Sequence, residues 1–291
     1  MTVEIGLNLF SVFRELNEDY FGTLEKVAGM DYKNIELITV NFTNGKRYSD
    51  TFTVSAIKQR FNELGLNAFA AHEGVAPGQS IMDNDWDKII AENAELECKS
   101  IVFPMAFIAG QEDTLQTAQH LNKIGKKCKE AGLAFYYHNH AHEFKRVGEQ
   151  SLFDLLVENT NPEYVKFELD LVWAMRGGYE PISLLEKLGA RCDLIHQKDL
   201  GQHVKPVNLF QTINLEDAEN PMKMYSDYVK PTDFVNLGTG IVNFEETYKK
   251  LNDLGHIRYA IVENEGQIGN KFSSIQSDLN VIEQTIQGLV K

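Results

Sequence analysis

The sequence has few of the features that mark secreted, membrane-spanning or nucleic-acid-binding proteins. Its three cysteines, Cys98, Cys128 and Cys192, are odd in number and widely spaced, so they form neither a disulfide framework nor a CxxC zinc motif. No apolar run reaches the roughly 18 residues that a membrane-spanning helix needs. The 42 acidic residues outnumber the 28 Lys and Arg, and the net charge of −14 disfavours nucleic acid and anionic membranes as partners.

Features of export are also missing at the start of the chain. The first residues lead directly into the strand-like segment VEIGLNLF, without a basic segment or a small-residue cleavage site. Together with the unpaired cysteines, this favours a reducing, cytoplasmic location, and the alternative is an export signal trimmed from the sequence. A small-molecule substrate fits this composition better than a macromolecular one.

Short apolar segments alternate with amphipathic ones along the whole chain. Strands are predicted at Glu4–Leu9, Asn34–Thr39, Leu66–His72, Ser100–Pro104, Ala134–His140, Val165–Asp170, Cys192–Lys198 and Tyr259–Glu263. Helices are predicted at Asn17–Met30, Thr53–Leu64, Asp83–Leu96 (with Asp83 as its cap), Asp113–Ala131, Ser151–Glu158, Pro181–Leu188, Asn243–Leu254 and Ser273–Leu289. Eight such units predict an α/β protein with a (β/α)8 TIM barrel, in a single domain spanning residues 1–291.

Two features refine this prediction. A doubly wound open sheet would normally carry a glycine-rich turn after its first strand, and the segment after Leu9, FSVFREL, has none. The rhythm breaks only at Gly201–Asn236, which contains Pro206, Pro221 and Pro231. We expect an extended loop there on the active face, acting as a lid or as a partner surface, for example in a homo-oligomer.

The most informative segment is AFYYHNHAHEF, residues 134–144. Its aromatic half is typical of a strand, and His138, His140 and His142 then alternate before Glu143. If the segment stays extended, the three imidazoles share one face and suit a divalent metal. The alternative is a set of core histidines whose hydrogen bonds are satisfied.

Charged and imidazole side chains also occur at the ends of other predicted strands. They occur in His72-Glu73-Gly74, in Phe167-Glu168-Leu169-Asp170, in His196-Gln197-Lys198-Asp199 and in Val262-Glu263-Asn264-Glu265. Such groups are costly inside apolar strands unless they are paired or bind a metal. The carboxyl ends of the strands meet at one face of a barrel, so these groups are expected to converge there.

Two or three carboxylates with one or two imidazoles suit Mn²⁺, Mg²⁺, Co²⁺ or Zn²⁺. Such a metal would hold neighbouring oxygens of a hydroxy-carbonyl compound and stabilise the enediolate formed by proton removal. A nearby carboxylate or histidine would act as the general base.

At these strand ends the sequence resembles the sugar phosphate isomerase/epimerase group of xylose isomerase-like TIM barrels. The matching segments, in order, are YHNHAHEF (137–144), FELDLVWAMRGG (167–178), LIHQKD (194–199), GTGIVNF (238–244) and VENEG (262–266). The resemblance implies a metal set of Asp170, His196 and Glu263 from strands six to eight. For strand five it implies Glu143, with His138 as the alternative that would favour Zn²⁺ or Co²⁺.

The remaining candidates surround this set. His138, His140 and Glu263 are expected to transfer protons, and His72, Trp173 and Lys198 to contact the substrate. The structural alternatives are a capping role for His72, packing at the barrel rim for Trp173, and a salt bridge from Lys198 to Asp199 or Glu168. Glu168 is expected beneath the metal ligands, Glu36 in a structural role, and Arg176 in solvent. No chemistry is expected of His120, His203 and His256.

The resemblance implies a metal-dependent isomerase or epimerase acting on a sugar or keto-sugar. The same chemistry permits a lyase or dehydratase acting on a keto-sugar or inositol derivative, because both reactions begin by removing a proton next to a carbonyl. An AP-endonuclease-like DNA-cutting barrel is disfavoured by the charge of −14. A catalytically silent sugar-binding barrel is the remaining alternative. Because no phosphate-binding glycine loop is found, a non-phosphorylated substrate is favoured.

Overall fold

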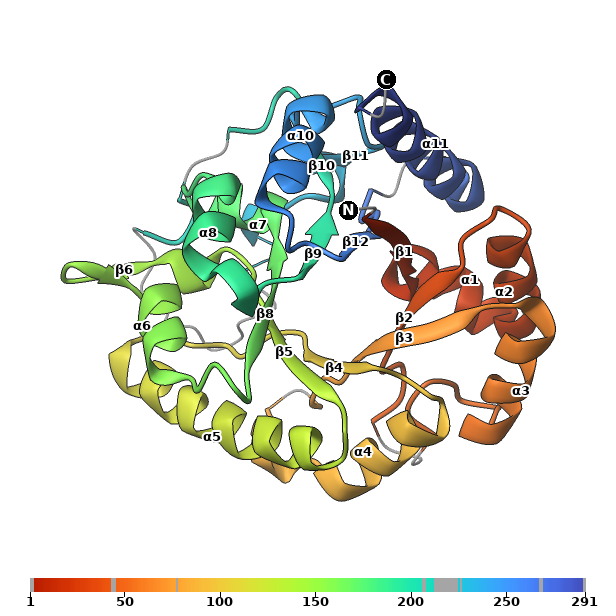
Figure 1. Ribbon diagram of the computed structural model, residues 1–291, viewed down its shortest axis with the longest axis horizontal. Coiled ribbons are helices and arrows are strands. Elements are labelled where there is room, and N and C mark those ends of the chain that lie inside the picture. Colours follow the sequence, from red (N-terminus) through yellow and green to blue (C-terminus); the bar gives the residue numbers. More distant parts are fainter. Residues whose placement is uncertain are drawn as a thin grey trace.

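Eight parallel strands close into a barrel, as the sequence predicts. The computed structural model describes residues 3–42, 46–76, 78–205, 208–211, 225, 227–266 and 269–289, and its strands follow the closed order β1-β12-β9-β8-β5-β4-β3-β2. Helices surround them (Figure 1). The strands are β1 (Glu4–Asn8), β2 (Asn34–Ile38), β3 (Asn67–His72), β4 (Ser100–Phe103), β5 (Ala134–His138), β8 (Lys166–Asp170), β9 (Leu194–Gln197) and β12 (Tyr259–Val262).

Several helices begin or end at local sequence signals. They are α1 (Phe13–Glu18), α2 (Tyr20–Ala28), α3 (Val54–Leu64), α4 (Trp86–Glu95), α5 (Gln111–Glu130), α6 (Leu152–Asn159), α7 (Leu171–Arg176), α8 (Pro181–Leu188), α10 (Phe244–Leu254) and α11 (Lys271–Leu289). Thr53 caps α3, and Ser151 caps α6 through a 3.0 Å hydrogen bond from the Asp154 amide. Gly65 and Gly255 end α3 and α10 with φ near +66° and +67°. None of the described helices has the length and apolar character to cross a membrane.

Three local predictions were wrong. The segment predicted as one helix, Asn17–Met30, divides because Asp19 accepts a hydrogen bond from the Gly22 amide (3.0 Å) and starts α2. Asp83 lies in a short 3-10 helix, and Asp85 caps α4 by accepting from the Lys88 amide (3.1 Å). The short helix α7 was not predicted, because its apolar residues directly continue strand β8.

The inside of the barrel changes character along its axis. An apolar cluster of Phe69, Ala70, Val102, Tyr136, Leu194 and Ile261 fills one part of it. Because side chains alternate along a strand, the residues two positions further on point the same way. Tyr136 is thus followed by His138, Leu194 by His196, and Ile261 by Glu263. The strand pattern therefore places a polar layer above an apolar floor, at the carboxyl ends of the strands.

The predicted extended loop, Gly201–Asn236, is only partly described. Asp199–Leu200 (β10) pairs in antiparallel fashion with Phe234–Val235 (β11), which brings both ends of the segment to the end of β9. Pro231 begins a 3-10 helix, Pro231–Asp233. Pro206 and Pro221 lie outside the described residues. The Asp199 carboxylate accepts from the amides of Gly238 and Gly240 (3.0 and 2.9 Å), which fixes the predicted GTGIVNF turn against β9.

Candidate metal centre

Four side chains from the last four barrel strands gather around one point. They are His138 at the end of β5, Asp170 at the end of β8, His196 in β9 and Glu263 directly after β12. One ligand atom of each lies within 4.8 Å of all the others, and all four residues are buried. The structure thus brings together Asp170, His196 and Glu263, the three ligands implied by the resemblance, with His138 as the fourth member.

Two atoms of this group receive no hydrogen bond in the described structure. His138 Nε2 and Asp170 Oδ2 are 3.6 Å apart. The other ring nitrogen of His138 and the other carboxylate oxygen of Asp170 are both hydrogen-bonded. His138 Nδ1 is 3.1 Å from the Pro104 carbonyl oxygen, and Asp170 Oδ1 accepts from the Trp173 amide at 2.7 Å. Because a carbonyl oxygen only accepts, His138 Nδ1 carries the proton and Nε2 presents a lone pair. Buried lone pairs that face one another are suited to holding a cation.

The remaining two members complete the donor set. His196 Nδ1 lies 2.8 Å from Glu263 Oε2 and 4.0 Å from Asp170 Oδ2. Two imidazoles and two carboxylates form a borderline donor set of the kind that binds Zn²⁺, Co²⁺ or Mn²⁺. These residues therefore fit a divalent metal, and the imidazole of His138 favours Zn²⁺ or Co²⁺ over the harder Mg²⁺.

Glu143, the predicted strand-five ligand, lies outside this group. Its carboxylate accepts from the Tyr137 hydroxyl (2.8 Å) and from the His140 amide (3.0 Å), and it is 3.2 Å from His142 Nδ1. Strand β5 ends at His138, so the chain after it is not extended and the three histidines do not share one face. The structure places His138, rather than Glu143, at the strand-five position of the group.

His140 and His142 have different surroundings. The His140 ring lies 5.0 Å from the His138 ring and 5.3 Å from the Trp173 ring, and no hydrogen bond in the described structure reaches its Nδ1. Burial, together with the nearby positive charge of Lys198, lowers the pKa of His140 well below its usual value. His142 is held by the Tyr225 hydroxyl (2.7 Å) and the Ala106 carbonyl (2.9 Å). His140 is therefore a neutral imidazole at the site, whereas His142 is part of the wall.

Lys198 reaches into the same group from the end of β9. Its ammonium group lies 2.7 Å from Glu263 Oε2 and 3.2 Å from Asp170 Oδ2, and it also pairs with Glu265. The alternative salt bridges to Asp199 or Glu168 are therefore not formed. Burial alone would lower the pKa of Lys198, but the carboxylates of Asp170 and Glu263 raise it well above its usual value. Lys198 thus carries a buried positive charge beside two candidate ligands.

Trp173 and Arg176, both on α7, are buried rather than exposed. The Trp173 ring packs against the rings of His140, Tyr225 and Phe234, with Lys198 Nζ 5.6 Å from its centroid. Arg176, expected in solvent, is only 2% exposed and pairs with Asp233 at 2.7 Å. It therefore fixes α7 to the 3-10 helix that precedes β11.

A second group adjoins the first and includes Glu36, for which a structural role was expected ahead of one at the pocket. Glu36, His72, Glu168 and His196 also bring one ligand atom each within 4.8 Å of the others. His72 Nε2 is 2.8 Å from Glu168 Oε2 and 3.2 Å from Glu36 Oε2, and these carboxylates outweigh burial and raise the pKa of His72 to about 9. Its predicted substrate contact remains a prediction. The sequence signal for Glu36 was a single charge inside the apolar strand NIELI.

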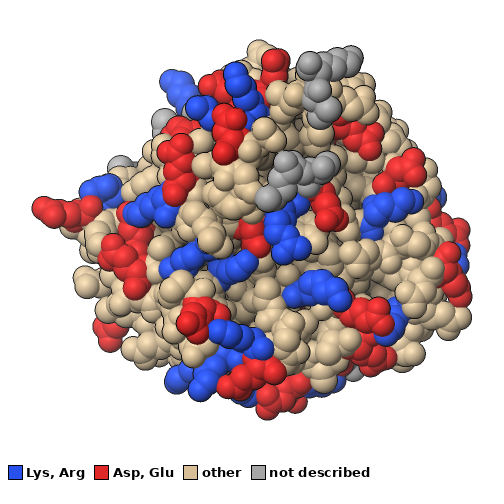
Figure 2. All heavy atoms as spheres, in the orientation of Figure 1, with Lys and Arg blue, Asp and Glu red and all other residues tan. Residues whose placement is uncertain are grey.

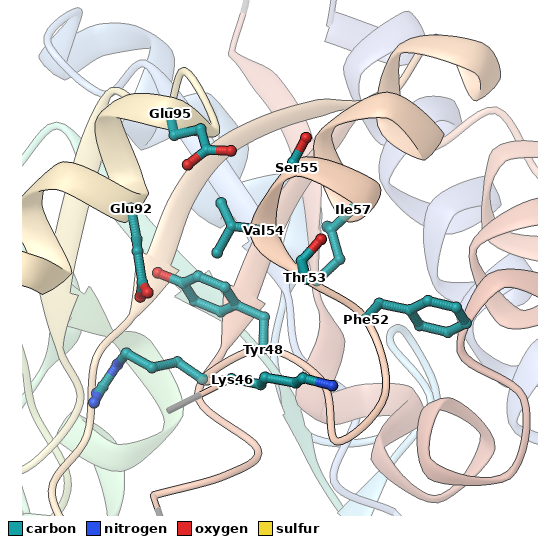
Figure 3. Close-up of a pocket in the computed structure, with 10 residues that line it drawn as sticks. Lys46, Tyr48, Phe52, Thr53, Val54, Ser55, Ile57, Glu92 and Glu95 are labelled. Atoms are coloured by element: carbon teal, nitrogen blue, oxygen red, sulfur yellow. The ribbon is translucent and has the colours of Figure 1, made fainter. Parts of the chain in front are cut away.

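The molecular surface offers a contrast to this buried site. Acidic and basic side chains are interspersed over the face seen in Figure 2. A separate pocket of about 270 Å³ lies beside α3 and α4, and its lining includes Tyr48, Glu92 and Glu95 (Figure 3). The Tyr48 hydroxyl donates a hydrogen bond to the Glu73 carboxylate, and neither residue belongs to the two donor groups. None of the predicted site residues lines this pocket.

A closed parallel barrel with polar and charged side chains gathered at the carboxyl ends of its strands has the arrangement of a TIM-barrel enzyme. The chain belongs to the xylose isomerase-like TIM barrel family, whose model matches residues 24–285. The inosose dehydratase of Geobacillus kaustophilus (strain HTA426) is 29% identical over 153 residues, which cover 53% of this chain and 44% of that protein. The chain thus spans about half the length of the curated relatives it matches.

Solved structures confirm the fold. A sugar phosphate isomerase/epimerase from Parabacteroides distasonis ATCC 8503 superposes with a TM-score of 0.75 and 23% identity, covering 98% of this chain and 96% of that one. The IolI protein, whose crystal structure contains a bound zinc atom, has a TM-score of 0.71 and 13% identity, covering 98% and 99%. At these identities the likeness is one of fold.

Proposed function

We propose that the protein is a divalent-metal-dependent lyase that removes water from a keto-sugar or a cyclic polyhydroxy ketone. The observation that carries the proposal is the group of His138, Asp170, His196 and Glu263, with two buried lone pairs facing each other. The name of the inosose dehydratase relatives supports a dehydration rather than the isomerisation or epimerisation first expected. The net charge of −14 supports a small-molecule substrate over DNA.

The residues around the group divide the proton transfers between them. His138, Asp170, His196 and Glu263 would hold a divalent cation, which would supply the positive charge that stabilises a carbonyl oxygen as it becomes negative. His140, neutral because burial lowers its pKa, accepts the proton from the carbon next to the carbonyl. The resulting electron pair forms a carbon–carbon double bond as the bond to the neighbouring hydroxyl breaks. That hydroxyl takes up the proton that His140 removed and leaves as water, which returns His140 to its neutral form.

Three further residues support this step. Lys198 holds a substrate oxygen and balances the charge of Glu263 and Glu265. Trp173, packed against His140, forms an apolar wall that keeps water from the base. Glu263, 2.7 Å from Lys198 Nζ and 2.8 Å from His196 Nδ1, fixes the Lys198 ammonium group relative to the substrate.

An isomerase or epimerase is the second candidate, because the same proton abstraction leads to it. The fold of the Parabacteroides distasonis structure, with the name that protein carries, supports this alternative. The two candidates differ in the step after proton removal: the lyase loses a hydroxyl, whereas the isomerase returns a proton. In heavy water the isomerase would yield an isomer of the substrate in which one hydrogen next to the carbonyl is replaced by deuterium.

The test is a panel of keto-sugars and inososes incubated with Mn²⁺, Co²⁺ or Zn²⁺. We expect a product lighter by one water in mass spectrometry, together with new ultraviolet absorption from the conjugated ketone. Asp170→Asn should abolish it, and the control Asp193→Asn, at the opposite end of β9, should retain it. Isomeric products of unchanged mass would transfer the proposal to the second candidate, and no turnover with any metal would refute both.

A further inference from the structure

His196 is the side chain that the two donor groups share, and its two ring nitrogens face different partners. Nδ1 faces the proposed cation site, 2.8 Å from Glu263 Oε2 and 4.0 Å from Asp170 Oδ2. Nε2 faces away from it, 2.6 Å from Glu36 Oε2 and 3.2 Å from Glu168 Oε1. The orientation of one ring therefore connects the metal centre to carboxylates deeper in the barrel.

The distances distinguish a cation site from a hydrogen-bonded network. Donor atoms that each lie about 2.0–2.1 Å from a tetrahedral metal are roughly 3.3 Å apart. Around His196 Nε2 the separations are 2.6 to 3.2 Å, which are hydrogen-bond lengths. In the other group, Asp170 Oδ2 stands 3.6 Å from His138 Nε2 and 4.0 Å from His196 Nδ1, and the 2.8 Å contact to Glu263 is the exception. The wider donor separations are on the Nδ1 side, where Lys198 Nζ also lies 3.2 Å from Asp170 Oδ2.

We propose that Glu36 is a positioning residue for the metal centre, acting through His196. Its carboxylate accepts a hydrogen bond from the Nε2–H of His196. This bond fixes the ring in the tautomer whose Nδ1 lone pair points at the cation. The inference rests on the proposed metal-dependent function. It assigns a role to a β2 residue that lies 160 positions from His196 in the chain and outside every segment that carries the family resemblance.

The carboxylate of Glu36 is itself held in place. Asn8, at the end of β1, donates from Nδ2 to Glu36 Oε2 at 2.8 Å. His72 Nε2 approaches the same oxygen at 3.2 Å. Glu36 is fully buried, and its side chain connects β2 to the neighbouring strands β1 and β3. A carboxylate held in this way determines the direction of its acceptor orbitals, which is what the orientation of an imidazole requires.

Glu168 is the competing acceptor, and its shorter contact is with His72 rather than with His196. Glu168 Oε2 accepts from His72 at 2.8 Å, whereas no hydrogen bond in the described structure reaches Oε1, the atom nearer to His196. Glu36 Oε2 is 0.6 Å closer to His196 Nε2 (2.6 against 3.2 Å) and meets hydrogen-bond geometry. Glu168 therefore positions His72, and Glu36 positions His196.

The experiment measures metal affinity rather than turnover. Co²⁺ is titrated into the metal-free protein against a competing chelator, and its visible absorption spectrum is recorded for Glu36→Ala, Glu36→Gln and Glu73→Gln. Glu73 is the matched control, because it is an equally buried glutamate paired with Arg47 at 2.7 Å, outside both donor groups. Thermal unfolding of each metal-free variant reports stability separately.

We expect Glu36→Ala to weaken Co²⁺ binding by about 10–100-fold, the usual effect of losing a partner of a metal-bound histidine. Glu36→Gln should weaken it less, because the amide oxygen still accepts from Nε2 but carries no charge. Glu73→Gln should bind within about twofold of the wild type, even where it unfolds at a lower temperature. A Glu36→Gln loss intermediate between the wild type and Glu36→Ala supports orientation by the carboxylate.

Three outcomes would overturn the proposal. In the first, Glu36→Ala and Glu73→Gln have equal affinities. In the second, the wild type binds two Co²⁺ and Glu36→Ala loses one, which would make Glu36 a ligand. In the third, Glu36→Ala does not fold and Glu36→Gln has the wild-type affinity and spectrum. If the wild type binds no Co²⁺, the proposed function fails as well, whereas normal Glu36 dependence without turnover refutes the function alone.

Discussion

The two ends of the barrel interior use buried polar groups in opposite ways. At the end where the strands begin, Asp193 is fully engaged, with the Tyr136 hydroxyl and Lys166 Nζ each 2.8 Å away. At the end where they finish, His138 Nε2, His140 Nδ1 and Asp170 Oδ2 receive no hydrogen bond within the described chain. Buried polar groups are normally hydrogen-bonded, and exceptions are concentrated at functional sites. The groups without hydrogen bonds at the carboxyl ends of the strands therefore indicate a binding site.

This contrast indicates which carboxylates to associate with function. Burial alone does not identify them, because Asp193, Glu73 and Asp278 are all buried and hydrogen-bonded away from the donor groups. The distinguishing property of Asp170 is a carboxylate oxygen that faces the His138 imidazole and receives no hydrogen bond from the described chain. Substitutions at the two ends of the barrel test whether that distinction holds.

The largest effect is expected from Asp170→Asn. The amide oxygen can still cap α7 by accepting from the Trp173 amide, so the fold should persist, but the second oxygen and the charge are lost. We expect metal affinity to fall by more than about 100-fold, beyond the range typical of outer partners. Chelator competition measures this, with Asp193→Asn as the control. Equal losses in both variants would abolish the distinction between the two ends.

Ile261→Ala tests the apolar floor beneath the site. Ile261 lies two residues before Glu263 and is fully buried in the cluster with Phe69 and Leu194. Removing its outer carbons should lower the free energy of unfolding by about 2–4 kcal/mol through lost burial and a residual cavity. Metal affinity should stay within a few fold, because the removed atoms belong to the apolar cluster and include no donor atom. Denaturant unfolding measures the loss of stability, and the Co²⁺ titration measures metal affinity. A large loss of Co²⁺ affinity would show that the apolar floor positions Glu263.

The sequence predicts the barrel well because its strand–helix rhythm is a local property. Each strand and cap depends on neighbours a few residues away, as with Thr53 or Gly255. The convergence of Asp170, His196 and Glu263 was also predictable, because the carboxyl ends of parallel strands meet at one face. Their individual roles required the family resemblance, and those roles remain predictions.

The errors concern places where distant contacts override local pattern. The alternation of His138, His140 and His142 suggested that they share one face of a strand. The strand ends at His138, however, and the chain turns there as the Glu143 carboxylate accepts a hydrogen bond from the His140 amide. Arg176 looked like a solvated loop residue, yet its partner Asp233 lies 57 positions away. Glu36 meets His196 only once the barrel closes. A single sequence does not reveal such pairings, because no local signal encodes them.

The smallest effect is expected from Asp278, a buried carboxylate on α11 beside the site but outside both donor groups. It accepts from the Leu237 amide and from Asn264 Nδ2, each at 2.7 Å. Burial outweighs these hydrogen bonds and raises its pKa from 3.8 to about 6. The folded protein therefore holds this proton more tightly than the unfolded chain. The stability that the proton confers is complete below about pH 4 and is lost as pH rises through about 6.

Asp278→Asn isolates this contribution, because the amide does not titrate. The free energy of unfolding of the wild type, minus that of the variant, should fall by up to about 3 kcal/mol between pH 4 and pH 6 and then level off. Urea unfolding across that range measures the difference, and the fixed cost of turning an acceptor into an amide cancels from the slope. A flat difference would mean that Asp278 stays ionised at low pH, as a carboxylate does beside a cation. Lys271, whose charge opposes the rise in the pKa of Asp278, would be that cation.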